Sequence, residues 1–307
     1  MKKHAILPLL LVSLLTLVGS GCEQKKFQDK PDYQFSSLAY NGSQYAAGTP
    51  GGIVLTSDDA HNWQAVEVPG TLDIRTMTTF QGQLIGISYV IGVTPSLNIS
   101  SANIVLKSNE GKTWQTWPIP MSGMVTGLAS NDRRLITTSD SGDILTSTDS
   151  THWSAVDLSS PTFGGVAWVN DNFIAWSDTT LFRSDDGLQW QQTPTPDGMY
   201  GIHAAAGDGT AITLAGDDGQ LWRLDGNNQW QRLDSQTQGH FYAIAWGDGR
   251  FVAVGYDNNH ALIRDSLDGV NWRKVTVAPN TPPLYSAIWD GTQFVIGGAN
   301  KKVLQLP

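Results

Sequence analysis

The chain is poor in cysteine and in charged side chains. Cys22 is the only cysteine among 307 residues, so no disulfide and no cysteine-based metal site can form within the chain. Charged residues make up 15% of the sequence, and the formal net charge is -9. Nucleic-acid binding depends on clustered Lys and Arg, and the sequence shows no such cluster. We therefore expect no nucleic-acid partner.

Common catalytic and metal-binding motifs are also missing. The sequence has no HExxH pair, no GxSxG nucleophile elbow and no phosphate-binding glycine loop. Nor is there paired metal spacing among the histidines beyond the N-terminal region, which are His61, His152, His203, His240 and His260. We expect no metal, no cofactor and no enzymatic activity. Glycoside hydrolysis is the one activity that remains open, because it needs only two carboxylates and the sequence has many aspartates.

Long apolar runs are absent except at the N-terminus. Lys2 and Lys3 precede an apolar run over residues 5–18, and small residues then lead to Cys22. This order predicts a signal peptide over residues 1–21. A membrane-spanning helix needs about 20 apolar residues, whereas this run is shorter and contains Pro8. The protein is therefore expected to be exported.

The position of Cys22 resembles the lipobox of bacterial lipoproteins, although Gly19 stands where leucine is usual. The resemblance implies lipidation at Cys22, a lipidated tether over residues 22–26 and attachment to a membrane. By resemblance to enterobacterial sorting, Glu23 favours the outer membrane, at its periplasmic face or at the cell surface. The alternative is an ordinary cleaved signal peptide followed by a free thiol.

The sequence is rich in copies of one seven-residue phrase, which reads serine, any residue, acid, small residue, two variable positions and tryptophan. Copies occur at 57–63, 108–114, 147–153, 184–190 and 266–272, and a weaker copy lies at 224–230. The acids are interpreted as turn formers and the tryptophans as packing between repeats. These structural residues are Asp59, Glu110, Asp149, Asp186 and Asp268, with Trp63, Trp114, Trp153, Trp190, Trp230 and Trp272.

Short apolar runs bounded by Gly and Asp lie between the phrases, and they predict four strands in each repeat. Repeats of this length cannot bury their apolar faces alone, which indicates an all-β propeller of four-stranded antiparallel blades. We predict seven blades, with six as the alternative, in a single domain over residues 27–307. Only three strands follow Trp272, so residues 27–31 are expected to supply the fourth and close the ring as 3+1.

The phrases resemble the Asp-box (BNR-like) repeats of the sialidase-superfamily propellers, and the resemblance covers nearly all of residues 27–307. Residues 243–255 with 265–272 look most like an uncharacterised exported bacterial lipoprotein branch. Sialidases use an arginine triad and a tyrosine partnered by glutamate. Here no arginine precedes Ser57, and the glutamates are confined to Glu23, Glu67 and Glu110. Sialidase catalytic residues therefore cannot be assigned in this chain.

Propeller ligands usually bind on what we term the top face, formed by the loops that enter the inner strands and the connections between second and third strands. One such connection, Ser88–Asn103, is much longer than the others and is expected to be a loop, either functional or packed on its own blade. The turn aspartates Asp140, Asp178, Asp217 and Asp257 could ring the channel mouth and attract a cation, or simply form turns. Further top-face candidates are Arg75, Tyr89, Tyr200, His203, His240, Tyr242 and Tyr285.

These observations favour a non-catalytic, membrane-anchored interaction scaffold of the bacterial cell envelope. We expect a monomer whose top face, centred on the Ser88–Asn103 connection, docks an unidentified envelope protein. The alternative is a glycan-binding or glycoside-hydrolysing propeller of the sialidase-like type.

Overall fold

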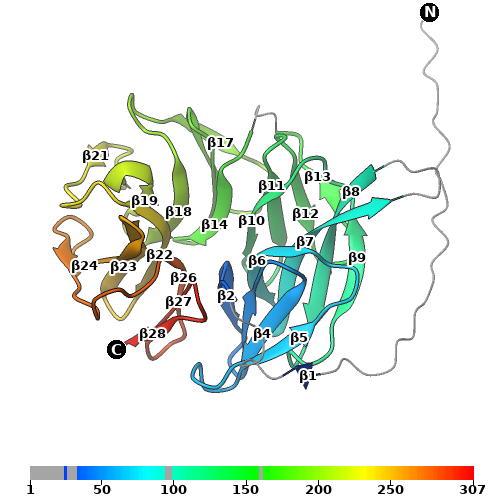
Figure 1. Ribbon diagram of the computed structural model, residues 1–307. Helices are drawn as coiled ribbons and strands as arrows, with labels where there is room; N and C mark the ends of the chain where they lie inside the picture. The colour runs from blue at the N-terminus through cyan, green and yellow to red at the C-terminus, as the bar shows by residue number, and fades with distance from the viewer. Residues whose placement is uncertain (1–23, 26–32, 94–98, 159–161) are drawn as a thin grey trace, which may run out of the picture.

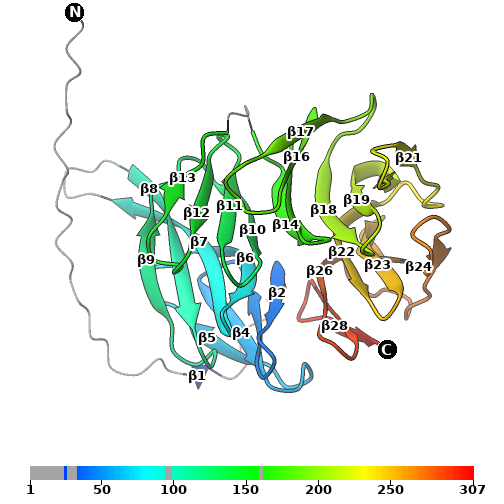
Figure 2. The same cartoon turned by 180° about the vertical axis from the view of Figure 1, so that it is seen from behind.

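Seven antiparallel sheets are arranged as blades around a central channel (Figures 1 and 2). The computed structural model describes residues 24–25, 33–93, 99–158 and 162–307. Adjacent inner strands contact one another around the whole ring, including the pair formed by the first and last blades. The prediction of a seven-bladed, all-β propeller is confirmed, and the six-bladed alternative is wrong.

The strands follow a regular order, with the inner strand first in each blade. Blades 1 and 2 consist of β2 (Ser37–Tyr40), β3 (Tyr45–Gly48), β4 (Ile53–Ser57) and β5 (Gln64–Glu67), then β6 (Asp73–Phe80), β7 (Gln83–Val93), β8 (Ile99–Ser108) and β9 (Gln115–Ile119). Blades 3 and 4 consist of β10 (Val125–Ser130), β11 (Leu135–Ser139), β12 (Ile144–Ser147) and β13 (Ser154–Ala155), then β14 (Gly165–Val169), β15 (Asn172–Trp176), β16 (Thr180–Ser184) and β17 (Gln191–Pro194). Blades 5 and 6 consist of β18 (Ile202–Gly207), β19 (Ile212–Gly216), β20 (Leu221–Leu224) and β21 (Trp230–Arg232), then β22 (His240–Gly247), β23 (Arg250–Asp257), β24 (His260–Ser266) and β25 (Arg273–Lys274). Blade 7 has β26 (Leu284–Trp289), β27 (Phe294–Gly298) and β28 (Val303–Leu306), and a 3-10 turn, η2 (Asp217–Gly219), joins β19 to β20.

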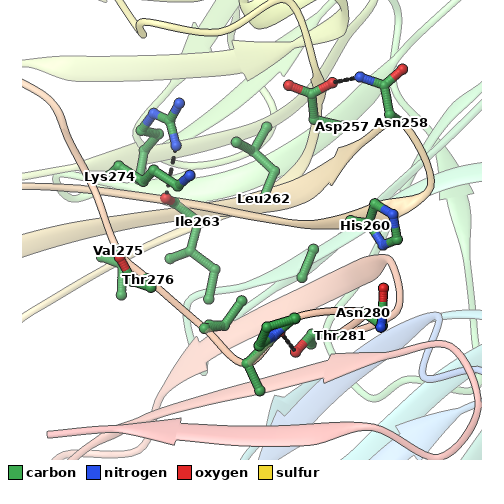
Figure 3. A pocket seen from close by; sticks show the side chains of 15 residues that line it. Asp257, Asn258, His260, Leu262, Ile263, Lys274, Val275, Thr276, Asn280 and Thr281 are labelled. Atoms are coloured by element: carbon green, nitrogen blue, oxygen red, sulfur yellow. Dashed lines mark hydrogen bonds between the residues drawn. The ribbon is translucent and has the colours of Figure 1, made fainter.

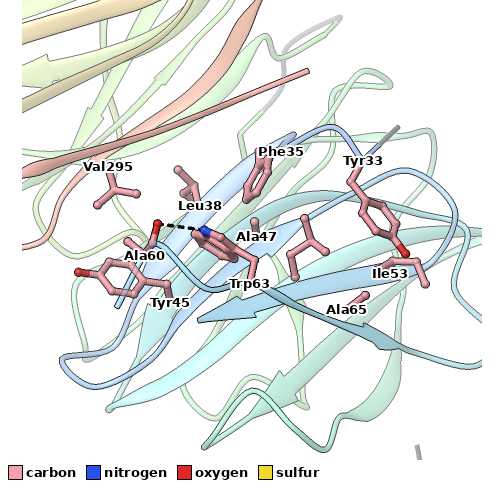
Figure 4. Close-up of a cluster of buried hydrophobic side chains, with 11 residues drawn as sticks. Tyr33, Phe35, Leu38, Tyr45, Ala47, Ile53, Ala60, Trp63, Ala65 and Val295 are labelled. Atoms are coloured by element: carbon pink, nitrogen blue, oxygen red, sulfur yellow. Dashed lines mark hydrogen bonds between the residues drawn. The ribbon is translucent and has the colours of Figure 1, made fainter. Parts of the chain in front are cut away.

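The core lies between blades, where the two faces of each sheet are covered by its neighbours. Every residue of the middle strands β3 and β4 is buried, whereas the ends of the outer strand β5 are exposed. Among the described residues, buried side chains form seven clusters. Tryptophans of the repeated phrase belong to three of these clusters and, partly buried, pack against three others. In Figure 4 Trp63 packs beside Phe35 and Tyr45, near Val295 of blade 7. A repeat therefore completes its core only against the next repeat.

The acid of the phrase organises the turn between the third and fourth strands. Asp268 Oδ1 accepts the backbone N–H groups of Val270 and Asn271 at 2.9 and 2.8 Å, and it also accepts the hydroxyl of Ser266. Asp59, Asp149 and Asp186 accept the same set of bonds in their own turns. Glu110 is exposed and makes no such bond among the described residues. We term the side of the ring that bears these turns the bottom face.

The indole N–H groups of the phrase tryptophans have different partners. Those of Trp63, Trp114 and Trp153 donate to the carbonyl three residues earlier, at 3.0 to 3.1 Å. Trp230 donates instead to Pro194 O in the neighbouring blade. Within the described part of the chain, the indole nitrogens of Trp190 and Trp272 have no acceptor. Packing between blades, rather than one repeated hydrogen bond, is therefore what the six positions share.

The ring closes where the N-terminal segment meets blade 7. Lys301 N–H donates to Tyr33 O at 2.8 Å, and Phe35 N–H donates to Gly298 O at 3.1 Å. The hydroxyl of Tyr45 in blade 1 also donates to Asp290 Oδ2 in blade 7, at 2.6 Å. Residues 27–31, expected as the fourth strand of blade 7, lie outside the described residues, as do the predicted signal peptide and Cys22. Strand β1 (Gln24–Lys25), within the expected tether, pairs with β5 of blade 1.

Candidate functional site

A repeated β-bulge shapes the top face where the inner strands begin. In five blades, the pairing between the inner strand and the second strand skips one residue of the inner strand near its start. The residues skipped by the pairing are Arg75, Thr126, His203, Tyr242 and Tyr285. Bulges redirect a side chain away from the regular alternation of a strand. In each of these blades the residue before the bulge is buried, whereas the bulge residue is at least partly exposed.

The bulge residues are distributed unevenly around the ring. Blades 5, 6 and 7 place a large side chain there, respectively His203, Tyr242 and Tyr285. Blade 3 has Thr126, and the residues that follow the buried Phe35 and Phe163 in blades 1 and 4 are serine and glycine. Aromatic surface therefore gathers over blades 5 to 7, and the opposite side of the ring is lined by small residues apart from Arg75.

Asp217, in the 3-10 turn of blade 5, links this surface to a neighbouring blade. Its Oδ1 accepts an N–H from His203 Nε2 and another from His240 Nδ1, both at 2.9 Å. An ionised carboxylate can only accept, so both imidazole nitrogens that face it are donors. The three side chains are each about one-third exposed. Gly201 lies against this carboxylate with φ of +56°, where a Cβ would collide with Asp217 Oδ2.

The aromatic rings complete a closed circuit with this carboxylate. His203 lies over Tyr242 with centroids 5.1 Å apart, and Tyr242 stacks on Tyr256 at 5.7 Å. Tyr256 in turn stacks on His240 at 5.0 Å, and Tyr285 joins from blade 7 at 5.5 Å from Tyr242. We term these six residues, Asp217, His203, His240, Tyr242, Tyr256 and Tyr285, the top-face cluster. Each ring is held by another, so the cluster is organised before any ligand binds.

Burial and hydrogen bonding set the charge of the cluster. Partial burial raises the pKa of Asp217, but the hydrogen bonds from His203 and His240 outweigh it, so the pKa lies below the usual range. Burial, with a hydrogen bond to Tyr256, raises the pKa of Tyr242 to about 12. Burial also raises the pKa of Tyr285. At neutral pH the cluster therefore combines the carboxylate of Asp217 with the uncharged phenols of Tyr242 and Tyr285.

Exposed apolar side chains lie on the same face. Tyr200, just before β18, is 47% exposed, and its hydroxyl donates to Asp218 Oδ2 at 2.6 Å. That hydrogen bond raises the pKa of Tyr200. Leu72 and Met124, just before β6 and β10, are 45% and 37% exposed. The top face therefore offers apolar contact area on several blades besides the cluster.

The other turn aspartates do not join the cluster. Asp140 accepts the Met124 backbone N–H at 2.8 Å, and Asp178 is an exposed turn residue of blade 4. Asp257 accepts from Thr237 and Asn258 and lines a groove of about 490 Å³ between β24 and the segment after β25 (Figure 3). Among the described residues, no group of three or more His, Cys, Asp or Glu side chains could hold a metal ion.

Arg75 and Tyr89 belong to blade 2, away from the cluster. Arg75 Nε pairs with Asp73 at 2.9 Å. The expectation of a loop at Ser88–Asn103 is wrong, because β7 and β8 pair continuously out to Val93 and Ile99, and Tyr89 lies within this hairpin. Figures 1 and 2 show the hairpin projecting beyond its blade. Only residues 94–98, which lie outside the described residues, connect its strands.

Tyr256 and Asp218 were missed by the sequence reasoning. Tyr256 lies at the end of β23, directly before the turn residue Asp257. Neighbouring side chains on a strand point to opposite faces, so the selection of Asp257 as a candidate did not include Tyr256 beside it. The sequence does carry one signal for Tyr256: it is an aromatic residue before a top-face turn, on the strand that pairs with the inner strand bearing Tyr242.

Comparison with known proteins finds likeness only at the level of structure. No protein-family model matches the chain, and no curated protein does so. Similar solved structures include a catalytically inactive virginiamycin B lyase from Staphylococcus aureus with Quinupristin, with a TM-score of 0.75 and 10% identity over 92% of this chain and 98% of that one. A streptogramin B lyase gives a TM-score of 0.73 and 13% identity, covering 93% and 96% of the two chains. YCF48 bound to a D1 peptide gives a TM-score of 0.67 and 14% identity, covering 92% and 96%.

At these identities the likeness shows the seven-bladed fold alone. Within the described residues, no helix is long and apolar enough to cross a membrane.

Proposed function

We propose that the protein is a non-catalytic interaction scaffold of the bacterial cell envelope, anchored through a lipid on Cys22. Its top face over blades 5 to 7 docks a protein partner. The observation that carries the proposal is the partly exposed, mutually stacked aromatic surface of the top-face cluster, next to the exposed Tyr200. Tyrosine is enriched at binding hot spots because it buries a large area at low entropic cost.

Further observations on the fold and the sequence support this proposal. The exposed Leu72 and Met124 extend the apolar area across the same face, as protein docking requires. YCF48, a protein of similar fold, has been solved with a D1 peptide bound. The predicted signal peptide and lipobox-like Cys22 support export and anchoring, and the Asp-box resemblance supports kinship with exported propellers.

The cluster also favours one alternative. Parallel tyrosine rings beside a carboxylate, as in Tyr242, Tyr256 and Asp217, would suit the apolar faces and hydroxyls of a sugar. A glycan-binding or glycoside-hydrolysing propeller is therefore the second candidate. It differs from the first in requiring a carbohydrate ligand and, for hydrolysis, a catalytic aspartate.

Affinity purification from membrane extracts distinguishes the two candidates. We expect the wild type to retain a specific protein that Tyr200→Ser loses by at least about tenfold, a change typical of a hot spot. Leu188→Ser is the matched control, because Leu188 is 44% exposed in a bottom-face turn. A form with the blade 2 hairpin cut to a four-residue turn shows whether that hairpin adds to the interface. Equal retention by Tyr200→Ser and wild type would contradict the docking face, and glycoside turnover abolished by Asp217→Asn would favour the alternative.

A further inference from the structure

Two imidazole nitrogens of the top-face cluster point at the carboxylate of Asp217. His203 and His240 each give one N–H to Asp217, which leaves His203 Nδ1 and His240 Nε2 with lone pairs when the rings are neutral. With neutral rings, the remaining polar atoms of these three side chains are therefore acceptors. A ligand group that fits them must supply several N–H donors.

The aromatic faces and the charge favour a cation. Tyrosine rings carry a negative face that attracts a cation within about 6 Å of the centroid, and Tyr242, Tyr256 and Tyr285 lie together in the cluster. Among the described residues neither Asp217 nor Asp218 is paired with a Lys or Arg side chain. The chain as a whole is also acidic, with a formal net charge of -9. Within the described residues, the ion-pair partners of Asp217 are therefore the two histidines alone, and no Lys or Arg of the chain occupies this surface.

We propose that the top-face cluster binds the guanidinium group of an arginine side chain on the protein partner. The inference rests on the proposed docking function and names the chemistry of its central contact. A guanidinium is planar and carries five N–H donors, so it can stack on a tyrosine ring while donating to Asp217 and an imidazole nitrogen. An ammonium group is a compact, strongly hydrated point charge and lacks this flat face.

The test uses the purified protein and two capped pentapeptides, acetyl-Gly-Gly-Arg-Gly-Gly-amide and its citrulline counterpart. Citrulline keeps the planar shape and loses the charge. Binding is followed by NMR through the imidazole signals of His203 and His240. We expect saturable binding of the arginine peptide in the low millimolar range, typical of one side chain, and at least tenfold weaker binding of the citrulline peptide.

Variants then locate the contact. Asp217→Asn keeps the shape of the side chain and should weaken the arginine peptide at least about tenfold, and Tyr242→Leu should weaken it severalfold. Asp140→Asn, in a top-face turn outside the cluster, should bind as the wild type does. Equal binding of the two peptides, or wild-type affinity in folded Asp217→Asn, would overturn the inference.

The two proposals can fail separately. A partner captured through Tyr200 whose binding is unchanged in Asp217→Asn would overturn the arginine contact and leave the docking face standing. Specific binding of the arginine peptide without any captured protein would overturn the docking of a protein partner and leave the arginine site standing.

Discussion

Replacing Trp63 by alanine should destabilise the closure between blades 1 and 7. The indole is 6% exposed, meets Phe35 edge-on at 4.9 Å and donates to Ala60 O at 3.0 Å. Removing a buried Trp side chain costs about 3–5 kcal/mol, because the cavity forms in a core that only partly relaxes. A change of 1 kcal/mol lowers the Tm of a domain of 150–250 residues by about 2–4 °C, so we expect a fall of roughly 10 °C.

Urea unfolding of Trp63→Ala measures this cost, with Trp230→Ala as the matched control. Trp230 occupies the corresponding place in its repeat but is only half-buried, so its removal should cost about half as much. A loss below about 1 kcal/mol for Trp63→Ala, or equal losses for both variants, would refute the packing argument. Coincident transitions by fluorescence and circular dichroism are needed to show that unfolding is two-state.

Three further predictions concern the anchor, the ring and the turns. Cys22→Ala should move the protein from membrane fractions into the soluble periplasm or medium, and unchanged membrane retention would contradict lipidation. Deleting residues 27–32 should lower the Tm and promote aggregation, because the expected fourth strand of blade 7 would be lost and the edge of β28 left unpaired. A truncated protein that melts at the parent's Tm and stays monomeric would show that the ring closes without this segment. Backbone hydrogen bonds from Asn62 and Asn271 hold the pKa values of Asp59 and Asp268 well below their usual range. The stability that these two ionised carboxylates provide is therefore complete above about pH 4, and it is lost as the pH falls through the lower pKa of the folded state. Urea unfolding at pH 7 and near pH 2 should therefore show Asp268→Asn less stable than wild type at pH 7 and closer to it in acid, whereas a difference independent of pH would count against this role.

The fold could be predicted from the sequence because the strands and turns of each repeat are indicated by its local sequence. Four copies of the phrase combine a turn-forming aspartate with an interblade tryptophan, and both follow from local chemistry, as Asp268 and Trp272 illustrate. The blade count followed from the six copies together with the three strands expected after Trp272. The hairpin of β7 and β8 was misjudged, because residues 89–93 pair with residues 99–103 and so extend both strands beyond the place where the other blades turn.

The candidate site was predicted only in part. His203, Tyr242 and Tyr285 were selected for their place near the start of inner strands, yet the bulge that exposes them is a property of pairing between strands. Asp217 was selected as one of four similar turn aspartates. Its contacts with two histidines depend on how neighbouring blades meet, and no local pattern encodes that geometry.

Photo-crosslinking in intact cells tests the central claim most directly. A photoreactive amino acid is placed at Tyr200 on the top face or, as the control, at Leu267, which is 62% exposed in a bottom-face turn. We predict a discrete crosslinked protein from the top-face position and none from the control. Equal crosslinking from both positions, or a product only from Leu267, would contradict the assignment of the top face as the binding face.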